Sequence, residues 1–576
     1  MGRRVKFRWS IAPRQPLLVR HLAGELKVPA LLAQCLINRG LSEPGQAAKF
    51  LEPRLKQLRD PFLLPNMAAA VERLFLARSR DEPLVIFGDY DADGVTSTAL
   101  LTEFLAALGW RVHQYLPHRL EEGYGLSQEG VETCLQKFPV HLLLAVDCGS
   151  SAVSTIAWLR QRGVDVVVLD HHQVSHPPPA ATALVNPQLA AEGPSSFREL
   201  CSAGLAFKLA FALVKRDREA ALSQARDFDL RPLLDLVALG TLADLVPLTG
   251  ENRILVTTGL QRLNTSRRPG VIALKAVSGV TGPVGGYEVG FQLAPRLNAA
   301  GRIETAAEAL NLMLARNLAE AEPLARNLDA RNRERQQIER GIAEQVIGAV
   351  RARFKAETDY VIVEGQLLWH IGVVGIVAAR VLREFHRPTI ILGGEGDQWR
   401  GSGRSIEGFD LAAALRQCDD LLLRHGGHAM AAGLAIRPQN LDALRHRLGE
   451  LARRTLTRDQ LQPSLCLDAE VDLGELTLER MNELQRLEPV GQGNPPVHFV
   501  VRQLRLQRPP RRMGRAQQHA KLWVTDGRAV GEVVWWGCEN AMLPSGNFDL
   551  AVAPQINEYS GCRSVQLKLL DWRPCG

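Results

Sequence analysis

Short apolar segments that lead directly into acidic residues recur in the first half of the chain. The segment PLVIFG, which ends at residue 88, is followed by DYDADG and then by leucines and a phenylalanine at helical spacing (100–108). HLLLAVDCGSS (141–151) and VDVVVLDHHQ (164–173) repeat this arrangement, with a segment of helical character between them. Strands of this length that alternate with helices predict a parallel sheet with right-handed crossovers.

The polar residues always follow the apolar segments, which would bring them together in space. Asp89–Asp93, Asp147 and Asp170–His172 would lie at the carboxyl edge of the sheet, where open α/β sheets form their ligand sites. A later helical stretch, RPLLDLVALGTLADLVPL (231–248), contributes Asp244. The pattern predicts one site rich in carboxylates and histidines.

Three further regions follow the parallel-sheet domain. Residues 316–357 are highly charged with sparse apolar positions, which is typical of a mostly solvated helix that bridges domains. A second α/β unit should follow, with strands at 359–365 and 388–394 around a helix at 370–385. From about residue 463, short alternating segments such as KLWVTDGRAVGEVVWWG predict a small β-barrel.

The expected fold class is therefore α/β, with a parallel-sheet domain, a long linker helix, a second α/β domain and a C-terminal barrel. The expected boundaries are 1–75 for an N-terminal extension, 76–315 for the parallel-sheet domain, 316–357 for the linker, 358–455 for the second domain and 463–576 for the barrel.

Composition narrows the class of protein without giving a function. The 576 residues are 46% hydrophobic and 23% charged, with a net charge of +7, which excludes a disordered or collagen-like chain and suggests several domains. The apolar segments are shorter than the roughly 18 residues of a membrane span, and the N-terminus lacks the apolar core of a secretory signal. Nine cysteines without a close CxxC pair indicate reduced thiols. We expect a cytoplasmic protein.

Crowded carboxylates at one sheet edge require either protonation or cations, because bare anions at this density would repel one another strongly. Hard oxygen ligands with one or two imidazoles suit Mn²⁺ or Mg²⁺, and the absence of clustered cysteines argues against structural zinc. The ligands suffice for two ions, which in phosphoryl chemistry clamp the attacking and leaving oxygens. The candidates are Asp89, Asp91, Asp93, Asp147, Asp170, His171, His172 and Asp244.

The spacing of these residues predicts individual roles. Asp91 and Asp93 could each face one ion, and Asp147 on the neighbouring strand could bridge both. His171 would complete the shell of one ion, and His172 could face a substrate phosphate. An isolated Asp-x-Asp most often only caps a helix, but three strands that end in this way favour a metal site.

Several of these segments resemble a known family. FGDYDADGVTST, LLAVDCGSS, VLDHH and LGTLADLVPL resemble successive motifs of the DHH phosphoesterase superfamily, and PRLNAAGR (295–302) resembles a motif of its RecJ exonuclease branch. HIGVVGIVAARV, WRGSGRS and RHGGHAMAAG resemble the DHH-associated domain. The C-terminal barrel is similar, less specifically, to the oligonucleotide-binding (OB) fold of RecJ.

This resemblance implies a DHH domain that holds two divalent cations, Mn²⁺ or Mg²⁺. His172 would contact the scissile phosphate, and Asp170 would orient the metal shell rather than bind an ion. Asp89 would lie close to the shell or support it. The implied metal shell consists of Asp91, Asp93, Asp147, His171 and Asp244.

Glycines and basic residues in the later motifs are candidates for phosphate binding. WRGSGRS (399–405) is predicted to form a loop that combines backbone donors with an arginine fork, and GGH (426–428) repeats this arrangement. Together they would place the substrate in a cleft between the second α/β domain and the DHH domain. The candidate residues are Arg119, Arg296, Asn298, Arg302, Ser402, Arg404, Ser405 and His428, and the alternative for each arginine is a surface ion pair.

The barrel contains a strongly basic segment. Residues 501–515 (VRQLRLQRPPRRMGR) include six arginines and no acid, and Trp523, Trp535 and Trp536 follow. Arginines near aromatic rings suit single-stranded nucleic acid, although a core position is favoured for the tryptophans. Arg511 and Arg512 are expected to bind the single-stranded nucleic acid.

The leading hypothesis is a metal-dependent exonuclease that degrades single-stranded DNA from its 5′ end in recombination and repair, with the polarity and the DNA preference implied by the resemblance alone. A helicase and a single-strand-binding protein are candidate partners of such an enzyme. One alternative is a phosphodiesterase of short oligonucleotides or cyclic dinucleotides, against which the basic barrel argues. The other is a non-catalytic DNA-binding replication factor, against which the intact acidic residues argue.

Overall fold

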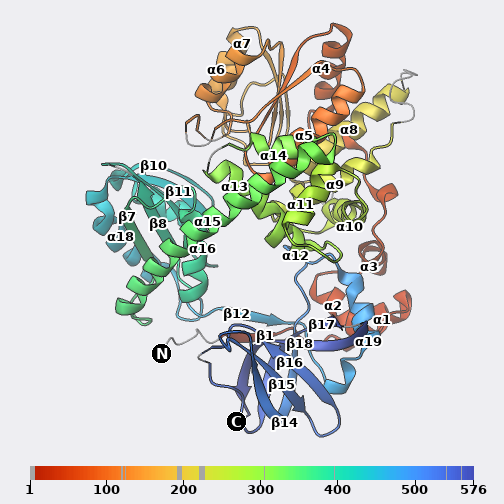
Figure 1. Ribbon diagram of the computed structural model, residues 1–576, viewed down its shortest axis with the longest axis vertical. Coiled ribbons are helices and arrows are strands. Elements are labelled where there is room, and N and C mark those ends of the chain that lie inside the picture. Colours follow the sequence, from red (N-terminus) through yellow and green to blue (C-terminus); the bar gives the residue numbers. More distant parts are fainter. Residues whose placement is uncertain are drawn as a thin grey trace. The chain divides into compact units, whose positions relative to one another are not determined.

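The computed structural model describes residues 7–118, 121–123, 125–190, 197–219, 228–303, 305–394, 396–539, 541–559 and 561–575. The chain forms two compact units (Figure 1). The parallel-sheet unit comprises Gly45–Arg333 and Leu487–Pro495. The terminal unit, which contains both ends of the chain, comprises Met1–Pro44, Glu334–Arg486 and Pro496–Gly576. The segment predicted as one N-terminal extension, 1–75, therefore contributes to both units.

A five-stranded parallel sheet lies at the centre of the parallel-sheet unit, with strand order β3-β2-β4-β5-β6. Gly88 of β2 pairs with Val146 of β4, and Val146 pairs with Leu169 of β5, so these three strands end at the same level. The predicted parallel sheet is confirmed. The strands are β2 (Leu84–Gly88), β3 (Val112–Tyr115), β4 (Leu142–Val146), β5 (Asp165–Leu169) and β6 (Ala183–Val185).

Both faces of this sheet are buried because successive strand residues point into different cores. Leu84 and Ile86 belong to a core shared with α4 (Met67–Ser79), α5 (Ala92–Ala107) and α8 (Ser202–Glu219). Val85 and Phe87 belong to the opposite core, which includes α6 (Gln128–Lys137) and α7 (Val153–Gln161). Figure 1 shows these helices on either side of the sheet. Continuous apolar strands are what a sheet covered on both faces requires.

Further helices complete the parallel-sheet unit. The helical stretch predicted at 231–248 contains α9 (Leu234–Ala243), which packs against α5 and is capped at its C-terminus by Asp244. A π-helical turn at Val289–Leu293 joins α12 to α13. The remaining helices are α3 (Pro44–Leu51), α10 (Gly250–Asn264), α11 (Pro269–Val277), α12 (Gly286–Glu288), α13 (Ala294–Ile303) and α14 (Ala307–Leu314).

The predicted linker helix is confirmed as α15 (Leu318–Arg353). It begins in the parallel-sheet unit and belongs to the terminal unit from Glu334 onward. Its second half buries Ile342, Val346 and Val350 against α16 (Val374–Phe385). The charged residue between these apolar positions, Glu344, is exposed, whereas Asp329 and Arg335 earlier in the helix are buried.

The second α/β domain has a five-stranded sheet with order β10-β11-β9-β8-β7. WRGSGRS, predicted as a loop, instead forms the middle strand β9, so its backbone pairs with β8 and β11. Side chains at Gly401 and Gly403 would collide with Leu392 and Leu411, so these glycines permit close packing. The elements are β7 (Ile362–Leu367), β8 (Thr389–Gly394), β9 (Trp399–Arg404), α17 (Leu411–Arg416), β10 (Leu422–Gly427), β11 (Ala431–Ile436) and α18 (Leu441–Thr455).

The C-terminal strands form an OB-like sheet rather than a strict barrel. The strand order is β13-β14-β15-β16-β18-β17, and the long strand β14 pairs additionally with β17. The N-terminal strand β1 (Arg8–Ile11) runs parallel to β12 (Ser464–Leu467). The other elements are α1 (Pro16–Leu26), α2 (Ala30–Asn38), β13 (Ala469–Glu470), α19 (Leu478–Leu484), β14 (Phe499–Met513), β15 (His519–Thr525), β16 (Val530–Trp535), β17 (Phe548–Tyr559) and β18 (Cys562–Pro574).

Within the described ranges, every helix is either too short or too polar to cross a bilayer.

Candidate metal centre and phosphate-binding residues

The acidic residues lie where the strand order of the parallel sheet reverses. From β2 the chain passes to β3 on one side and then to β4, β5 and β6 on the other. Asp89 directly follows β2, Asp147 follows β4 and Asp170 follows β5. Ligands of open α/β sheets bind at this reversal, outside the carboxyl ends of the strands.

The DYDADG segment turns sharply from β2 into α5. Asp91 caps α5, and its Oδ1 accepts hydrogen bonds from the N–H groups of Asp93 (2.9 Å) and Gly94 (3.1 Å). A side chain at Gly94 would collide with the backbone of Asp89, so this tight turn requires glycine. One function of Asp91 is thus the capping role that a single Asp-x-Asp predicts, and this role uses only its Oδ1.

Helix α13, which contains PRLNAAGR, packs against this acidic loop. Asn298 Oδ1 accepts a 2.7 Å hydrogen bond from the N–H of Ala92. A side chain at Gly301 would collide with Tyr90, so the helix packs directly on the loop. These contacts favour a positioning role for Asn298 over the predicted substrate contact.

Helix α8 fixes Asp93 and Asp147 from the other side. The N–H groups of Ser202 and Ala203 donate to the two carboxylate oxygens of Asp93, at 2.7 and 2.8 Å. The hydroxyl of Ser202 donates to Asp147 Oδ1 at 2.8 Å. Cys201, one residue earlier, places its sulfur near Asp93 and Asp244. The sequence patterns did not single out Cys201 or Ser202.

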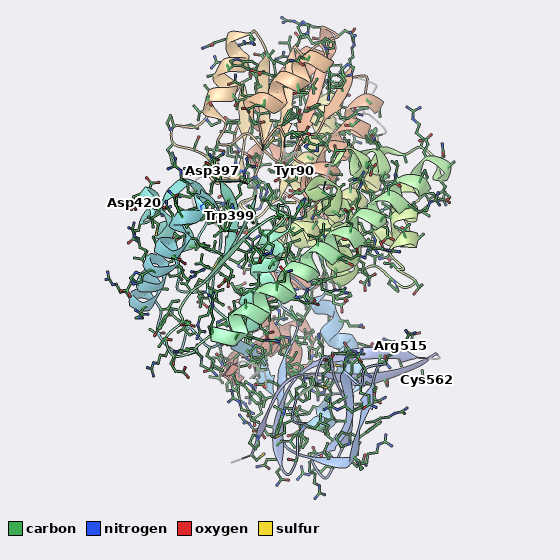
Figure 2. All side chains as sticks on the ribbon, turned by 60° about the vertical axis from the view of Figure 1, so that its left-hand side comes forward. Tyr90, Asp397, Trp399, Asp420, Arg515 and Cys562 are labelled. Atoms are coloured by element: carbon green, nitrogen blue, oxygen red, sulfur yellow. The ribbon has the colours of Figure 1, made fainter. Side chains whose placement is uncertain are left out.

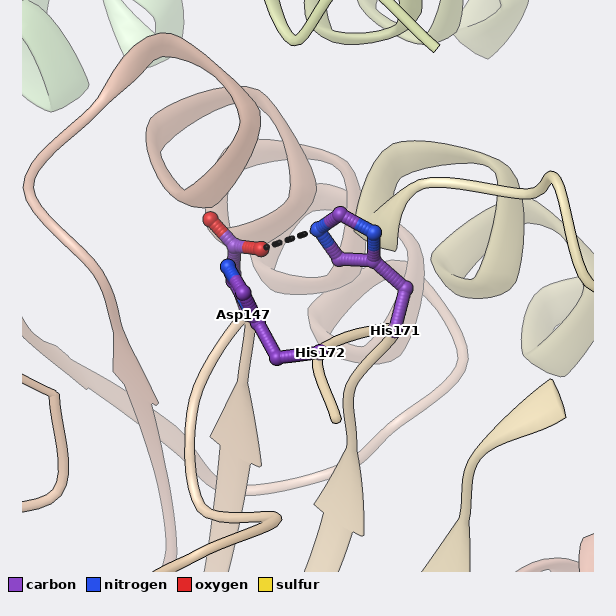
Figure 3. Close-up of side chains that lie close together, drawn as sticks. All are labelled: Asp147, His171 and His172. Carbon is purple, nitrogen blue, oxygen red and sulfur yellow. Dashed lines mark ion pairs between the residues drawn. The ribbon is translucent and has the colours of Figure 1, made fainter. Parts of the chain in front are cut away.

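Asp147 and His171 meet above the ends of neighbouring strands (Figure 3). Asp147 has a φ of 64°, a left-handed conformation that is uncommon outside glycine and is concentrated at functional sites. His171 Nε2 lies 3.4 Å from Asp147 Oδ1, 3.6 Å from Asp244 Oδ2 and 4.0 Å from Asp93 Oδ2. The structure thus brings four of the predicted ligands around one space.

His172 is held by Asp170. Its Nδ1 lies 2.8 Å from Asp170 Oδ1, whose other oxygen accepts a hydrogen bond from the N–H of Ser150 at 3.0 Å. The His172 side chain is 38% exposed, whereas Asp170 is buried. Asp170 therefore orients the His172 ring, whose other nitrogen remains available to a substrate.

Burial and mutual repulsion shift the acid–base properties of the cluster. Burial and the charge of Asp91 raise the pKa of Asp93 to about 6, and burial raises the pKa of Asp244 to about 8. Burial also raises the pKa of Asp147 well above its usual range. Burial lowers the pKa of His171 to about 4. Without compensating positive charge, these groups resist the ionised state.

The donor set fits divalent cations. Three groups of residues each have ligand atoms within 4.8 Å of one another, and two of the groups share Asp147. His171 Nε2 and Asp244 Oδ2 are buried without a hydrogen-bond partner in the described part of the chain, as expected of atoms that hold a cation. Carboxylates with imidazole suit Mn²⁺ and Mg²⁺. The three groups are Asp89, Asp91 and Asp147; Asp147, His171 and His172; and Asp93, Cys201 and Asp244.

Arg404 occupies an unusual position on β9. Its guanidinium donates to Ser402 Oγ at 2.9 Å and to the Gly403 carbonyl at 2.8 Å. A side chain at Gly375, in the first turn of α16, would come close to the side chains of both Ser402 and Arg404. Burial lowers the pKa of Arg404, and within the described ranges no carboxylate pairs with it. A partly buried cation beside a helix N-terminus suits an anion.

The other predicted substrate residues have different surroundings. Ser405 is buried and donates to the Phe409 carbonyl at 2.6 Å, which favours a structural role. His428 is exposed directly after β10. Arg296 pairs with Asp329 at 2.9 Å, the ion-pair alternative. Arg302 lies partly buried in α13, and Arg119 lies outside the described residues.

Some arginines of β14 are exposed, whereas others hydrogen-bond the backbone or stack on an aromatic ring. Arg511 is exposed, whereas Arg512 donates to the backbone carbonyls of Cys538 and Ala541. Arg508 stacks on Trp523, with 3.4 Å from the guanidinium carbon to the ring centroid. Arg515, labelled in Figure 2, lies in the turn after β14. The hydrogen bonds that Arg512 makes to these carbonyls argue against its predicted contact with the nucleic-acid strand.

The tryptophans also differ from one another. Trp535 is buried, as favoured for a core residue, but Trp536 is 47% exposed and lies beside His519.

Three family models match separate parts of the chain. The model described as DHH family, N-terminal domain, matches residues 83–241. The DHHA1 domain matches residues 358–454, and the RecJ OB domain matches residues 467–571. They match the parallel sheet, the sheet that contains β9 and the OB-like sheet, respectively.

Known proteins resemble the chain over nearly its whole length. The single-stranded-DNA-specific exonuclease RecJ of Dickeya dadantii is 38% identical, over 96% of this chain and 97% of the relative. The structure of Thermus thermophilus RecJ with Mn²⁺ aligns with a TM-score of 0.84 at 31% identity, over 99% of this chain and 80% of that chain. The Mg²⁺ complex of RecJ from this organism gives 0.78 at 30% identity, over 99% and 79%. The chain belongs to the RecJ family of single-stranded-DNA-specific exonucleases.

Proposed function

We propose that the chain is a metal-dependent exonuclease that hydrolyses single-stranded DNA from the 5′ end. The observation that carries the proposal is the cluster at the reversal of the sheet, where buried carboxylates and His171 surround one space. A cluster of like charges is costly unless cations complete it. The 5′ polarity is the expectation raised by the family resemblance.

The chain's own residues would divide the chemical work. Asp89, Asp91, Asp93, Asp147, His171 and Asp244 would hold two divalent cations, which when bound activate water and neutralise charge on the phosphate. Asp170 holds Nδ1 of His172 and leaves Nε2 free to hydrogen-bond a non-bridging phosphate oxygen. Asn298 and the start of α8 keep the acidic loop in place during turnover.

Arg404 is proposed to bind a phosphate of the substrate. Its guanidinium is already oriented by Ser402 and Gly403, so little conformational freedom would be lost on binding. A terminal 5′-phosphate carries more negative charge than a bridging one, so it would be the preferred ligand. His428 and Arg302 are proposed as further contacts.

The OB-like sheet is proposed to bind the single strand through residues separate from those of hydrolysis. Arg511 offers an exposed positive charge, and Trp536 offers an exposed ring for a base. We further propose a cytoplasmic enzyme that acts in recombination and repair, with a helicase and a single-strand-binding protein as candidate partners.

The function can be tested with end-labelled DNA. Wild type and the variant Asp91→Ala are incubated with single strands labelled at the 5′ or 3′ end, a duplex and a dinucleotide, with Mn²⁺, Mg²⁺ or a chelator. We expect early release of the 5′ label from single strands, with metal only and not by the variant. Preferred turnover of the dinucleotide would favour the oligonucleotide phosphodiesterase, and binding without cleavage would favour a replication factor.

A further inference from the structure

Cys201 is a soft donor within a set of hard donors. Its sulfur, one oxygen of Asp93 and one oxygen of Asp244 all lie within 4.8 Å of one another. The thiol is fully buried, and its sulfur lies 3.4 Å from Thr241 Oγ1. Carboxylates favour Mn²⁺ and Mg²⁺, whereas a cysteine sulfur favours softer ions such as Zn²⁺ and Cd²⁺.

Two unpartnered atoms point into the same space. Asp244 Oδ2 and His171 Nε2 are buried, have no hydrogen-bond partner within the described ranges and lie 3.6 Å apart. His171 Nε2 is also 4.0 Å from Asp93 Oδ2. Cys201 Sγ thus forms one donor group with the carboxylates of Asp93 and Asp244, and His171 Nε2 lies near both of these carboxylates. Sulfur beside oxygen and nitrogen ligands is a donor set that zinc accepts.

The fold keeps the sulfur at this position. The next two residues after Cys201, Ser202 and Ala203, donate their N–H groups to Asp93 at 2.7 and 2.8 Å. A side chain at Gly240 would collide with Thr96, Ala203 and Asp93, so α9 packs tightly over this junction. The chain directly after Cys201 is therefore fixed beside the carboxylate of Asp93.

We propose that Cys201 determines the cation selectivity of the Asp93–Asp244 position by providing a sulfur ligand to thiophilic cations. Mn²⁺ and Mg²⁺ would bind through oxygen and nitrogen and leave the thiol protonated. Cd²⁺ or Zn²⁺ would form a bond to sulfur, the S–H bond would break, and its proton would pass to solvent without any change of oxidation state. Such an ion would be held tightly and would displace the activating ion.

Cadmium absorption provides a direct test, because a bond between Cd²⁺ and thiolate absorbs in the ultraviolet. The full chain, freed of metal by a chelator, is titrated with Cd²⁺ alone in a background where the exposed residues Cys466 and Cys562 are changed to serine. Cys201→Ser is compared with Cys134→Ser, which removes a buried thiol of α6 outside the three donor groups.

We expect Cys201→Ser to lose one sulfur–cadmium absorption and to bind Cd²⁺ roughly tenfold or more weakly, while its Mn²⁺ affinity stays within about twofold of wild type. Cys134→Ser should match its background in both respects. Equal absorption in Cys201→Ser and its background would overturn the proposal. The proposal shares its ion site with the proposed function, but a chain that binds Mn²⁺ without this absorption would contradict only the inference about Cys201.

Cadmium NMR of the unsubstituted chain covers the case in which Cys201→Ser fails to fold. A resonance in the range of sites with one sulfur ligand, displaced by excess Mn²⁺, is the expected result. A signal only in the range of all-oxygen sites would overturn the proposal.

Discussion

The acidic edge of the parallel sheet and the arginine-rich strand β14 both concentrate one sign of charge, but at different depths. Asp93, Asp147 and Asp170 are almost completely buried, and hydrogen bonds from neighbouring elements hold each of them. Arg505 and Arg511 on β14 are exposed. Water screens exposed charges, whereas buried ones must be compensated within the protein.

This difference in depth predicts a difference in the effect of substitution. Removing a carboxylate from the buried edge disrupts a shared cation site and leaves its neighbours without their partners. Removing one arginine from β14 deletes only one of several contacts with single-stranded DNA, and solvent screens each of these contacts. Arg404 lies between these extremes, because it is only partly buried and has no carboxylate partner within the described ranges.

The largest effect should come from Asp147→Asn. Asp147 belongs to two of the three donor groups, so loss of its charge weakens both. We expect kcat for nucleotide release from single-stranded DNA with Mn²⁺ to fall about 1,000-fold or more. Asp81→Asn, at an exposed acid of the same unit, is the matched control and should remain fully active. A loss of less than tenfold would mean that the acidic edge is not the catalytic centre.

Arg404→Gln should have the next largest effect. Loss of a preoriented guanidinium should lower kcat/KM on 5′-phosphorylated strands roughly 10- to 100-fold. The effect should be smaller on strands without the phosphate. Arg416→Gln, at an exposed arginine of the same domain, should behave as wild type. Equal losses on both substrates would exclude recognition of the terminal phosphate.

Metal removal should make stability depend on pH. Burial raises the pKa of Asp93 to about 6 and that of Asp244 to about 8 in the folded chain. The folded state then binds more protons than the unfolded state, so stability should fall as the pH rises through this range. We expect the melting temperature of chelated protein to drop by about 5 °C between pH 5 and pH 8.

Mn²⁺ should remove this dependence because it binds the deprotonated carboxylates. Scanning calorimetry at several pH values, with chelator or Mn²⁺, measures both effects. A chelated protein that becomes more stable toward pH 8 would contradict the expected cost of the buried charges.

The smallest effect should come from β14. Arg505→Glu with Arg511→Glu should weaken binding of single-stranded DNA only about three- to tenfold at moderate salt, and reduce the slope of log affinity against log salt by about 1.4. Fluorescence anisotropy at several salt concentrations measures both. Arg512→Gln is the internal comparison, because its hydrogen bonds to carbonyls predict lower stability with an unchanged salt slope. If the salt slope changed for Arg512→Gln and not for the Arg505→Glu, Arg511→Glu variant, Arg512 and not the exposed pair would be the contact with DNA.

Sequence patterns were enough to predict the acidic edge, because its aspartates come directly after apolar strands in the chain. A strand of apolar residues that ends in Asp89 or Asp147 fixes the position of each acid once the strands pair in parallel. The contacts of Cys201 and Ser202 could not be predicted this way. They depend on α8 approaching Asp93 from more than 100 residues away in the chain.

The basic regions were harder to predict for two physical reasons. Glycines in WRGSGRS suit a loop and a tightly packed strand equally well, and only the facing residues Leu392 and Leu411 decide for the strand. On β14, irregular pairing between Arg508 and Arg511 breaks the alternation of side chains. A regular pattern therefore cannot tell that Arg511 is exposed whereas Arg512 is bonded to the backbone.

The stoichiometry of Mn²⁺ binding tests the central claim most directly, namely that the buried acidic edge is a site completed by two cations. Chelated wild type and Asp147→Asn are titrated with Mn²⁺ by isothermal titration calorimetry in buffers of different ionisation enthalpy. We predict two ions bound with release of protons by wild type, and weakened binding of both by Asp147→Asn, because two donor groups share this residue. Unchanged binding of two ions by Asp147→Asn, or no binding by wild type, would contradict the account.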